Sequence, residues 1–316
     1  SEAQMRVRIG EKLTKGLGVG GDPTRGERAA DESRDEPYDI LRGTEMVFVT
    51  AGMGGGTGTG AAPVVAEIAK DCGALTIGVV TKPFQWEGAR RMKQAEEGLA
   101  RLRDKVDTLI AIPNSRLVEI CPADATIEMA FETADDVLRQ AIQSISNIIS
   151  QNGSINLDFN DVRTTMSEAG PALLAVGRAS GENRAAEAAR AATTSPLLHQ
   201  SIAGAQNVLF NVTHSGNIQL RELDIAARVI AEMVDPEANI IFGTVVDPRV
   251  GEEIHMTVIA TGFAPRAATI DDGLEITRSI RDYGLPGVSN MDDAELPAFL
   301  RRNIRSLNTS RPLGEG

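Results

Sequence analysis

The sequence predicts an α/β fold in which a mostly parallel sheet is joined by a long central helix to a second, α+β domain. Over residues 1–113, short apolar runs alternate with segments of helical composition, which is typical of a parallel sheet covered on both faces. A loop rich in glycine connects one apolar run to the next helical segment. From about residue 126 to 150, apolar residues recur with helical spacing, as expected of one long helix between the two domains.

The first half is expected to alternate strands with helices. The expected strands are 46–50, 75–81 and 108–112, and the expected helices are 24–42, 61–71 and 88–104. Pro37 lies inside the first helical segment and should split or kink it, because proline lacks the amide hydrogen that an interior helix position needs.

The second half is expected to form a domain of its own. Its expected helices are 158–167, 182–193 and 220–233, and its expected strands are 172–178, 207–213, 239–246 and 254–262. From Ala264 onward no periodicity is sustained, which indicates a tether. The predicted division of the chain is 1–125, 126–151 for the connecting helix, 152–263, and 264–316 for the linker and tail.

Composition excludes several functional classes. The net charge of −12 argues against nucleic acid as a partner, because binding to phosphate backbones needs clustered Lys and Arg. No apolar run approaches the length of about 20 residues that a membrane span needs, so we expect no direct membrane insertion. Three scattered histidines and the absence of a Cys/His cluster argue against zinc, and we expect no metal ligands among the side chains. Cys72 and Cys121 suit a reducing cytoplasm as small apolar residues.

The glycine-rich loop predicts phosphate binding. It follows an apolar strand and precedes a helix, where free backbone N–H groups face an anion. Glycines let the backbone approach phosphate oxygens, and threonine hydroxyls add donors. A flexible linker would sit on a polar background instead. The residues of this tract are Gly54, Gly55, Gly56, Thr57, Gly58, Thr59 and Gly60.

Two familiar phosphate loops fit poorly. A Walker loop ends in Gly-Lys, and the chain contains no such pair. Gly56-x-Gly58-x-x-Ala61 loosely matches the dinucleotide fingerprint, but the next strand closes on Lys82 rather than on the acid that would hold a ribose. A dinucleotide-dependent oxidoreductase therefore remains a weaker alternative.

A second glycine cluster could present further amides to a polyphosphate. Gly18, Gly20 and Gly21 belong to the run Gly16–Gly21, which ends in Asp22-Pro23 before a helix. Turns of this kind are common, so the cluster is a weak signal by itself.

Several side chains are candidates for contacts with a nucleotide. Glu87 and Arg91, four residues apart, form either a surface ion pair or part of a site. Asn114 ends a strand at the carboxyl edge of the sheet, where it is either a turn residue or a ligand contact. Phe131 and Asp135 share a helix face, on which a purine could stack while a carboxylate accepts from guanine. Spacing alone favours a core phenylalanine beside two solvated acids.

These motifs together resemble the tubulin family, and within it the bacterial cell-division GTPases of the FtsZ family. The glycine tract is similar to the family's signature, and the other matching segments follow in one register from about Ile9 to Gly262. These segments are Thr14–Pro23, Val80–Gly88, Ile112–Asn114, Asn156–Val162 and Pro236–Gly243.

The resemblance implies a function as well as a fold. It implies binding of GTP and GDP with Mg²⁺, and GTP hydrolysis by a protein that polymerises head to tail into the division ring, in the cytoplasm at midcell. It also implies that Glu87 accepts from ribose hydroxyls and that Arg91 lies along the phosphates. Asp136 is then the likelier reader of guanine by family position, with Asp135 at a neighbouring contact.

The acids after the long helix carry the sharpest hypothesis. Asp158 and Asp161 are three residues apart, so both carboxylates lie on one face of the first turn of a helix. Asp158 could instead serve only as the helix cap. The resemblance implies that they act in trans, orienting the water that attacks the γ-phosphate in the neighbouring subunit, with Asn156 helping to place it. A structural polymer with negligible hydrolysis is the alternative.

The two ends of the chain carry further expectations. Leu296–Arg302 is an apolar and basic cluster in a polar tail, and it resembles the peptide by which family members engage membrane-anchoring proteins at the division site.

Family members begin with a strand, a first glycine loop and a helix before the region where this chain starts. The chain is therefore expected to be a fragment lacking these elements, whose own activity is in doubt.

Overall fold

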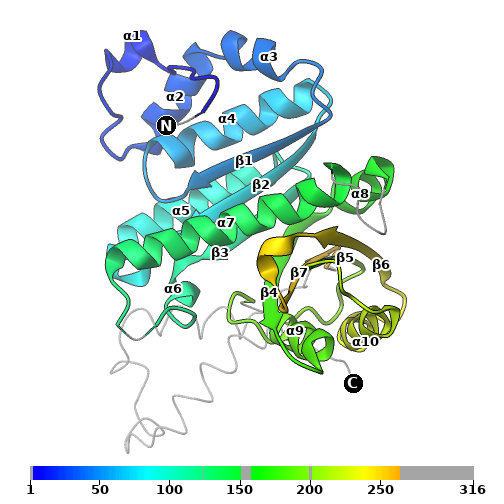
Figure 1. The fold of residues 1–316 in the computed structure, drawn as a ribbon. Helices are drawn as coiled ribbons and strands as arrows, with labels where there is room; N and C mark the ends of the chain where they lie inside the picture. Colours follow the sequence, from blue (N-terminus) through cyan, green and yellow to red (C-terminus); the bar gives the residue numbers. More distant parts are fainter. Residues whose placement is uncertain (1–2, 123, 151–157, 199–200, 264–316) are drawn as a thin grey trace, which may run out of the picture. The chain divides into compact units, whose positions relative to one another are not determined.

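The fold is built around one long, twisted sheet (Figure 1). A computed structural model describes residues 3–122, 124–150, 158–198 and 201–263. The strands are β1 (Met46–Gly52), β2 (Leu75–Lys82), β3 (Thr108–Pro113), β4 (Gly170–Ala179), β5 (Asn207–His214), β6 (Asn239–Val246) and β7 (Ile254–Thr261). Within the described residues they form a seven-stranded sheet of order β1-β2-β3-β4-β7-β5-β6.

The sheet is mostly parallel, as predicted. β1 to β4 pair in parallel, β5 pairs in parallel with β6, and β7 is antiparallel to both β4 and β5. The two halves of the sheet join where β3 meets β4, and the paired register there runs only from Thr108 opposite Gly170 to Ile110 opposite Ala172. The sheet is thus continuous but has a short seam between its halves.

The helices connect the strands and cover the sheet. The α-helices are α1 (Glu11–Thr14), α2 (Pro23–Glu32), α3 (Asp35–Leu41), α4 (Thr57–Asp71), α5 (Ala89–Arg103), α6 (Asn114–Leu117), α7 (Ile127–Ser150), α8 (Phe159–Met166), α9 (Arg184–Thr193) and α10 (Leu220–Ala231). The short 3₁₀ helices are η1 (Gln85–Glu87) and η2 (Pro248–Val250). The break between α2 and α3 lies just before Pro37, which sits in the first turn of α3, so the predicted split is confirmed.

Opposite faces of β1 to β3 bury different side chains. Val47, Val49 and Val80 pack with α4 and α5 on one face. Ile77 and Val79 pack on the other face against α7, whose buried stripe includes Ala134, Val137, Ala141 and Ile145. The alternation along β2 follows from the two-residue period of a strand. This burial on both faces is why the strands read as near-continuous apolar runs.

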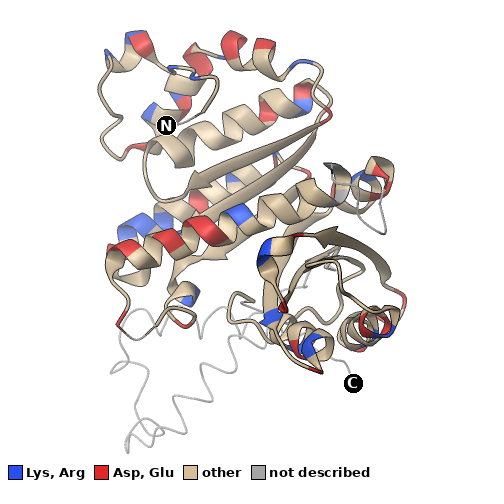
Figure 2. Ribbon diagram, in the orientation of Figure 1, with Lys and Arg blue, Asp and Glu red and all other residues tan. Residues whose placement is uncertain are grey.

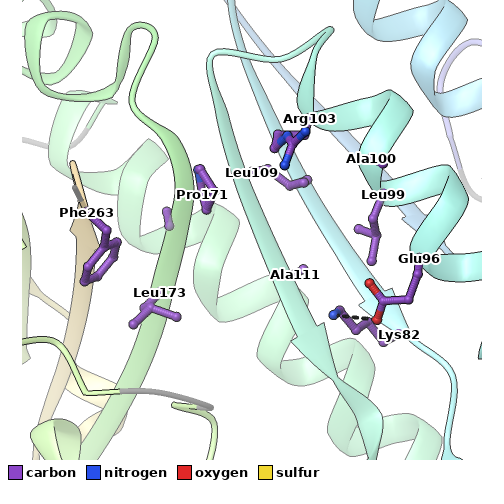
Figure 3. A pocket seen from close by; sticks show the side chains of 11 residues that line it. Lys82, Glu96, Leu99, Ala100, Arg103, Leu109, Ala111, Pro171, Leu173 and Phe263 are labelled. Carbon is purple, nitrogen blue, oxygen red and sulfur yellow. Dashed lines mark hydrogen bonds and ion pairs between the residues drawn. The ribbon is translucent and has the colours of Figure 1, made fainter. Parts of the chain in front are cut away.

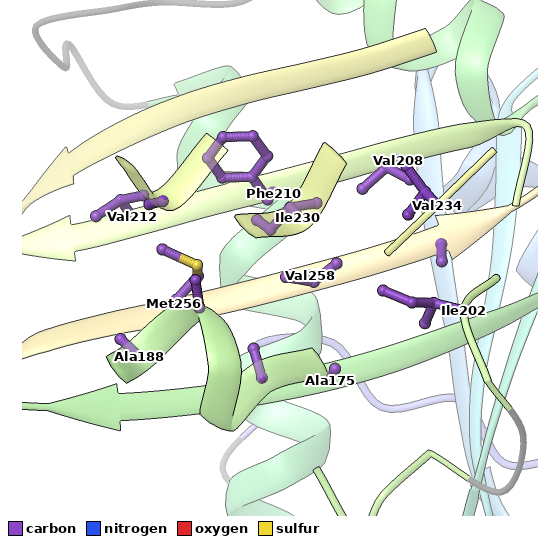
Figure 4. Packing of buried hydrophobic residues seen from close by; sticks show 14 of the residues in the cluster. Ala175, Ala188, Ile202, Val208, Phe210, Val212, Ile230, Val234, Met256 and Val258 are labelled. Carbon is purple, nitrogen blue, oxygen red and sulfur yellow. The ribbon is translucent and has the colours of Figure 1, made fainter. Parts of the chain in front are cut away.

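A third apolar cluster holds the C-terminal strands to α9 and α10 (Figure 4). Phe210, Met256 and Val258 belong to the strands of this cluster, and Ala188 and Ile230 come from the helices. A Cβ on Gly177 of β4 would lie 2.4 Å from the backbone nitrogen of Ala192, so α9 packs directly on the strand. Small residues on α9 permit this short distance.

Charged residues lie on the helices and loops, with both signs interspersed (Figure 2). The strands are almost free of them, apart from Lys82 at the end of β2 and Arg178 in β4. Charged residues are rare in the strands because the strands are buried, and burying a charge without a partner is costly.

The helix after β1 begins earlier than predicted. α4 starts at Thr57, four residues before the predicted start at residue 61, so Gly58, Thr59 and Gly60 lie in its first turn. A Cβ on Gly60 would overlap the carbonyl oxygen of Pro23 and lie 2.6 Å from the nitrogen of Glu27. Gly60 is thus required where α2 crosses α4 with backbone atoms in contact, and Gly58 is required where α4 packs on Gly52 of β1.

Substituting Gly60 with alanine should therefore lower stability. Because the added methyl group would meet the backbone of α2, we expect Gly60→Ala to cost about 1–3 kcal/mol, as overpacking usually does. The free energy of unfolding in urea, measured without nucleotide, checks this. Gly55→Ala is the matched control, since no atom lies within 4 Å of its Cβ position. Equal stability of the two variants would contradict this account of the tract.

Candidate nucleotide-binding site

A cavity of about 370 Å³ lies at the carboxyl ends of β1, β2 and β3. The loops that follow parallel strands meet at one edge, which is where open α/β sheets bind ligands. The first half of α7 closes the cavity from the opposite side. Its lining is Thr50, Ala51, Gly52, Met53, Thr81, Pro83, Glu87, Arg91, Asn114, Phe131, Ala134, Asp135 and Leu138.

The glycine tract borders this cavity and starts α4. Gly54 has φ +95°, and its N–H donates to the Thr59 hydroxyl at 2.8 Å, so the loop is closed by a residue of the following helix. Thr59 is fully buried and its hydroxyl serves the loop, whereas Thr57 is exposed at the first helical position. The first backbone N–H groups of α4 have no partner within the helix, which favours an anion at this point.

Not every glycine of the tract faces free space. A Cβ on Gly54 would lie 2.7 Å from the carbonyl of Arg91, and a Cβ on Gly58 would lie 2.6 Å from that of Gly52. Gly56 packs against Val19 and the backbone of Gly21. Only Gly55 in this tract has no atom within 4 Å of its Cβ position. The open stretch of backbone is therefore shorter than the sequence motif.

The second glycine cluster lies beside the first. The contact between Gly56 and Gly21 brings the two glycine loops together. Gly20 and Gly21 have φ of +67° and +75°, and Gly18, Gly20 and Gly21 all have open space where a Cβ would lie. The structure thus places both predicted loops at one location.

Asn114 belongs to the cavity lining and has an unpartnered side-chain acceptor. Its side chain is 5% exposed, and its Oδ1 is buried without a hydrogen-bond partner. An unpaired buried carbonyl costs about 1–3 kcal/mol, so the position calls for a donor from a ligand or water. Asn114 begins the short helix α6, which the sequence did not predict.

Glu87 and Arg91 form the ion pair that their spacing suggested, and both line the cavity. Arg91 Nη1 lies 3.0 Å from Glu87 Oε2, and the Glu87 side chain is only 10% exposed. The other Glu87 oxygen accepts from the backbone N–H of Phe84 at 2.8 Å, which fixes the η1 turn. The pair is therefore part of the cavity wall rather than a free surface contact.

Phe131 and Asp135 also line the cavity, on the same face of α7. Phe131 is 44% exposed and meets Phe84 edge to face, with ring centroids 5.5 Å apart. Trp86 stacks on Phe84 with nearly parallel planes. Sequence reasoning missed Phe84 and Trp86, although their scarce residue type and their place directly after β2 gave a signal.

Asp136 is not among the residues that line this cavity. Its Oδ1 accepts from Arg139 Nη2 at 3.0 Å, and it faces a separate polar cleft of about 550 Å³ between α7 and the C-terminal strands. In the same cleft, hydrogen bonds from Arg249 lower the pKa of Asp247 to about 2. Of the two acids, the structure brings only Asp135 to the other predicted contacts.

The predicted catalytic acids lie far from the cavity within one subunit. Asp158 caps α8 by accepting from the N–H of Asn160 at 3.2 Å, and Asp161 is exposed in the first turn. Arg163 of α8 donates to the carbonyl of Gly73, just beyond the last residue of α4. Since α4 spans about 22 Å and starts at the glycine tract, α8 lies near its opposite end (Figure 1). Asn156 lies outside the described residues.

A second cavity, of about 280 Å³, opens between α5 and β4 (Figure 3). Leu99 and Arg103 of α5 face Leu173 and Phe263 across it. Lys82, the residue that weakened the dinucleotide interpretation, pairs here with Glu96 at 2.9 Å. None of the predicted nucleotide contacts line this cavity.

The described residues contain no cluster of three or more His, Cys, Asp or Glu side chains that could hold a metal ion.

Comparison with known proteins finds two matching family models and several similar solved structures. Residues 1–122 match the Tubulin/FtsZ family, GTPase domain, and residues 170–264 match the FtsZ family, C-terminal domain. An empty FtsZ dimer from M. jannaschii is 44% identical, with 80% of this chain and 74% of that chain covered and a TM-score of 0.78. A point mutant of FtsZ from M. jannaschii is 43% identical, covering 83% and 79% of the two chains, with a TM-score of 0.80.

A protofilament of CetZ2 from Haloferax volcanii bound to GTPγS shares the fold. It is 21% identical, 88% of this chain and 84% of that chain are covered, and the TM-score is 0.65.

The fold and the site thus define a tubulin-like, guanine-nucleotide-binding GTPase. The two matched domains and the identity to solved relatives go further: the chain belongs to the FtsZ family. It is a GTP-binding and GTP-hydrolysing cytoskeletal protein that self-associates into filaments, which confirms the predicted fold class and activity. The oxidoreductase alternative no longer applies.

Removing the ring of Phe131 should weaken nucleotide binding. Because base–aromatic stacking contributes about 1–3 kcal/mol, we expect Phe131→Ala to reduce GTP affinity about 5- to 150-fold. Calorimetric titration below the assembly concentration measures this. Ile127→Ala, one turn earlier on α7 and 66% exposed, is the control and should bind normally. Equal affinities would exclude stacking on Phe131.

Proposed function

We propose that the cavity binds the guanosine part of GTP and that the two glycine loops hold its phosphates. The unpartnered Oδ1 of Asn114 is the observation that carries this assignment, because it requires a donor that a ribose hydroxyl or a purine amine supplies. Phe131 offers a ring for the base, and Glu87 an acceptor for ribose hydroxyls. Arg91 and the amides of Gly18, Gly20, Gly21, Gly55 and Thr57 are suited to phosphate oxygens.

The carboxylate that selects guanine is assigned to Asp135 first. It shares the cavity with Phe131, and a carboxylate can accept from both N1–H and the exocyclic amine of guanine. The family position favours Asp136 instead. Since Asp136 is bound to Arg139 and faces the other cleft, it would need a rotamer change to reach a base.

Hydrolysis is proposed to use groups from two subunits. Because α8 lies near the end of α4 away from the glycine loops, Asp158 and Asp161 are suited to reach the nucleotide of a second copy. There Asp161 would orient the attacking water and accept its proton, with Asp158 and Asn156 beside it. A pocket at one end and acids at the other make the contact heterologous, so that it repeats head to tail.

Mg²⁺ is proposed to enter with the nucleotide. The ion prefers phosphate oxygens and water over an all-protein cage, in keeping with the lack of a metal cluster among the described side chains. When bound, it would neutralise phosphate charge that no Walker lysine balances here. The chain's own contribution is the row of backbone amides and Arg91.

The cellular setting is also a proposal. We place the filament in the cytoplasm, at the midcell division ring, where Leu296–Arg302 would engage membrane-anchoring proteins. That segment lies outside the described residues. None of the helices that the structure describes is both long and apolar enough to cross a membrane.

Replacing Asp161 should separate binding from hydrolysis. A positioned general base contributes about 10²- to 10⁴-fold, so Asp161→Ala should lower GTP turnover of assembled protein at least about 100-fold. GTP affinity of unassembled protein should not change. Phosphate release and sedimentation, measured together, give turnover per polymer. Asp224→Ala, a surface acid of α10, is the control. Undiminished turnover by Asp161→Ala would remove Asp161 from catalysis and favour a structural role for the loop.

The tail assignment has its own test. A peptide of residues Glu295–Arg302 should retain a purified division-site anchoring protein, because its apolar side chains can fill a groove while its arginines pair with acids. A peptide with Phe299→Ala and Leu300→Ala should lose this binding. If neither peptide binds any such protein, the tail has another role.

A further inference from the structure

Three aromatic rings connect the inside of the nucleotide cavity to the protein surface. Phe131 lines the cavity, and Phe84 meets it edge to face, with planes at 87°. Trp86 stacks on Phe84 with a centroid distance of 5.2 Å and an angle of 17° between the planes. Phe84 is 2% exposed, so the ring between the other two is fixed by its surroundings.

Trp86 keeps most of its own surface in water. It is the chain's one tryptophan, and it is 64% exposed despite its stacking on Phe84. An exposed tryptophan leaves a large apolar area unburied, and tryptophan is among the residues most enriched at energetic centres of protein interfaces. The exposed side chain of Trp86 therefore suggests a contact with another protein chain.

The location of Trp86 identifies that partner. Trp86 follows the carboxyl end of β2, at the sheet edge that carries the nucleotide cavity. Leu17, in the second glycine cluster, and Val118, after α6, are 76% and 58% exposed. Exposed apolar side chains thus occur in three separate segments, around Leu17, Trp86 and Val118. In the proposed mechanism, the acid-bearing end of a second copy covers this edge.

The η1 turn, which carries Trp86, contributes to the wall of the cavity. Glu87, its neighbour in η1, lines the cavity and accepts from the backbone N–H of Phe84. Phe131 meets the ring of Phe84 edge to face. A purine that stacks on Phe131 and a ribose that engages Glu87 would therefore act on two groups that both contact Phe84.

We propose that Trp86 is a contact residue in the joint between two copies of this chain, and that the Phe84–Phe131 pair makes its position depend on whether a purine fills the cavity. The inference rests on the proposed function, because it takes the cavity as the guanosine site. Trp86 then links nucleotide occupancy to assembly: the base orders Phe131, Phe131 supports Phe84, and Phe84 presents the indole to the next copy.

Substitutions of Trp86 test its role in the joint. Trp86→Ala should raise the critical concentration for GTP-driven assembly about tenfold, the effect expected of an interface hot spot. Trp86→Phe, which keeps a ring stacked on Phe84, should change it less than about threefold. Tyr38→Ala, an exposed aromatic residue on α3, is the control and should assemble like the wild type. Sedimentation with GTP gives each critical concentration.

Tryptophan fluorescence tests both parts in the unaltered chain. With a single tryptophan, a shift of emission to shorter wavelength in sedimented polymer would report burial of Trp86. Below the assembly concentration, GDP at a concentration that saturates both proteins should change the emission of the wild type but not that of Phe131→Ala. This readout holds even if Trp86→Ala folds poorly.

The outcomes separate this inference from the proposed function. If the wild type binds GTP and assembles, while Trp86→Ala assembles equally well and polymer emission is unshifted, the role of Trp86 is refuted and the site assignment stands. If the wild type binds no guanine nucleotide, the proposed site fails, and this inference fails with it. A shift on assembly without any response to GDP would refute the dependence on the purine.

Discussion

The contact between the backbones of α2 and α4 is the constraint on which the rest of the nucleotide-binding half depends. Gly60 lies against Pro23, and Gly26 lies against the carbonyl of Gly56, so no side chain fits between the two helices. This contact fixes where α4 begins and therefore where its free amides point. The glycine-rich tract is needed for packing before any ligand is considered. The proposed phosphate binding would use a helix start that packing has already determined.

Much of the fold could be predicted because strands that are buried on both faces of a sheet appear in the sequence as continuous apolar runs. β1 to β3 fall within two residues of their predicted ranges, since their apolar runs end where the chain leaves the core. The start of α4 was wrong by four residues, because glycine composition suggests a loop unless the crossing of α2 is known. Helices as short as α1 and α6 carry too few residues to show a period.

The candidate site could be predicted only for residues whose place in the fold follows from their position in the chain, directly after a strand. Asn114, Glu87 and the tract Gly54–Gly60 follow β3, β2 and β1, so parallel pairing is enough to bring them to one edge. The aromatic contact of Phe84 with Phe131 depends on how α7 packs, which no local pattern encodes. Asp135 and Asp136 differ by about 100° around the helix axis, so a small helix rotation decides which one faces the cavity.

The seam between β3 and β4 determines how the two halves can transmit force. Only the stretch from Thr108 to Ile110 pairs with β4, so few ladder hydrogen bonds cross from one half of the sheet to the other. α7 packs on β2 in one half and on β6 and β7 in the other. Tension along a filament would thus pass from one half to the other both through this short strand pairing and through the side chains of α7, which bridges the seam.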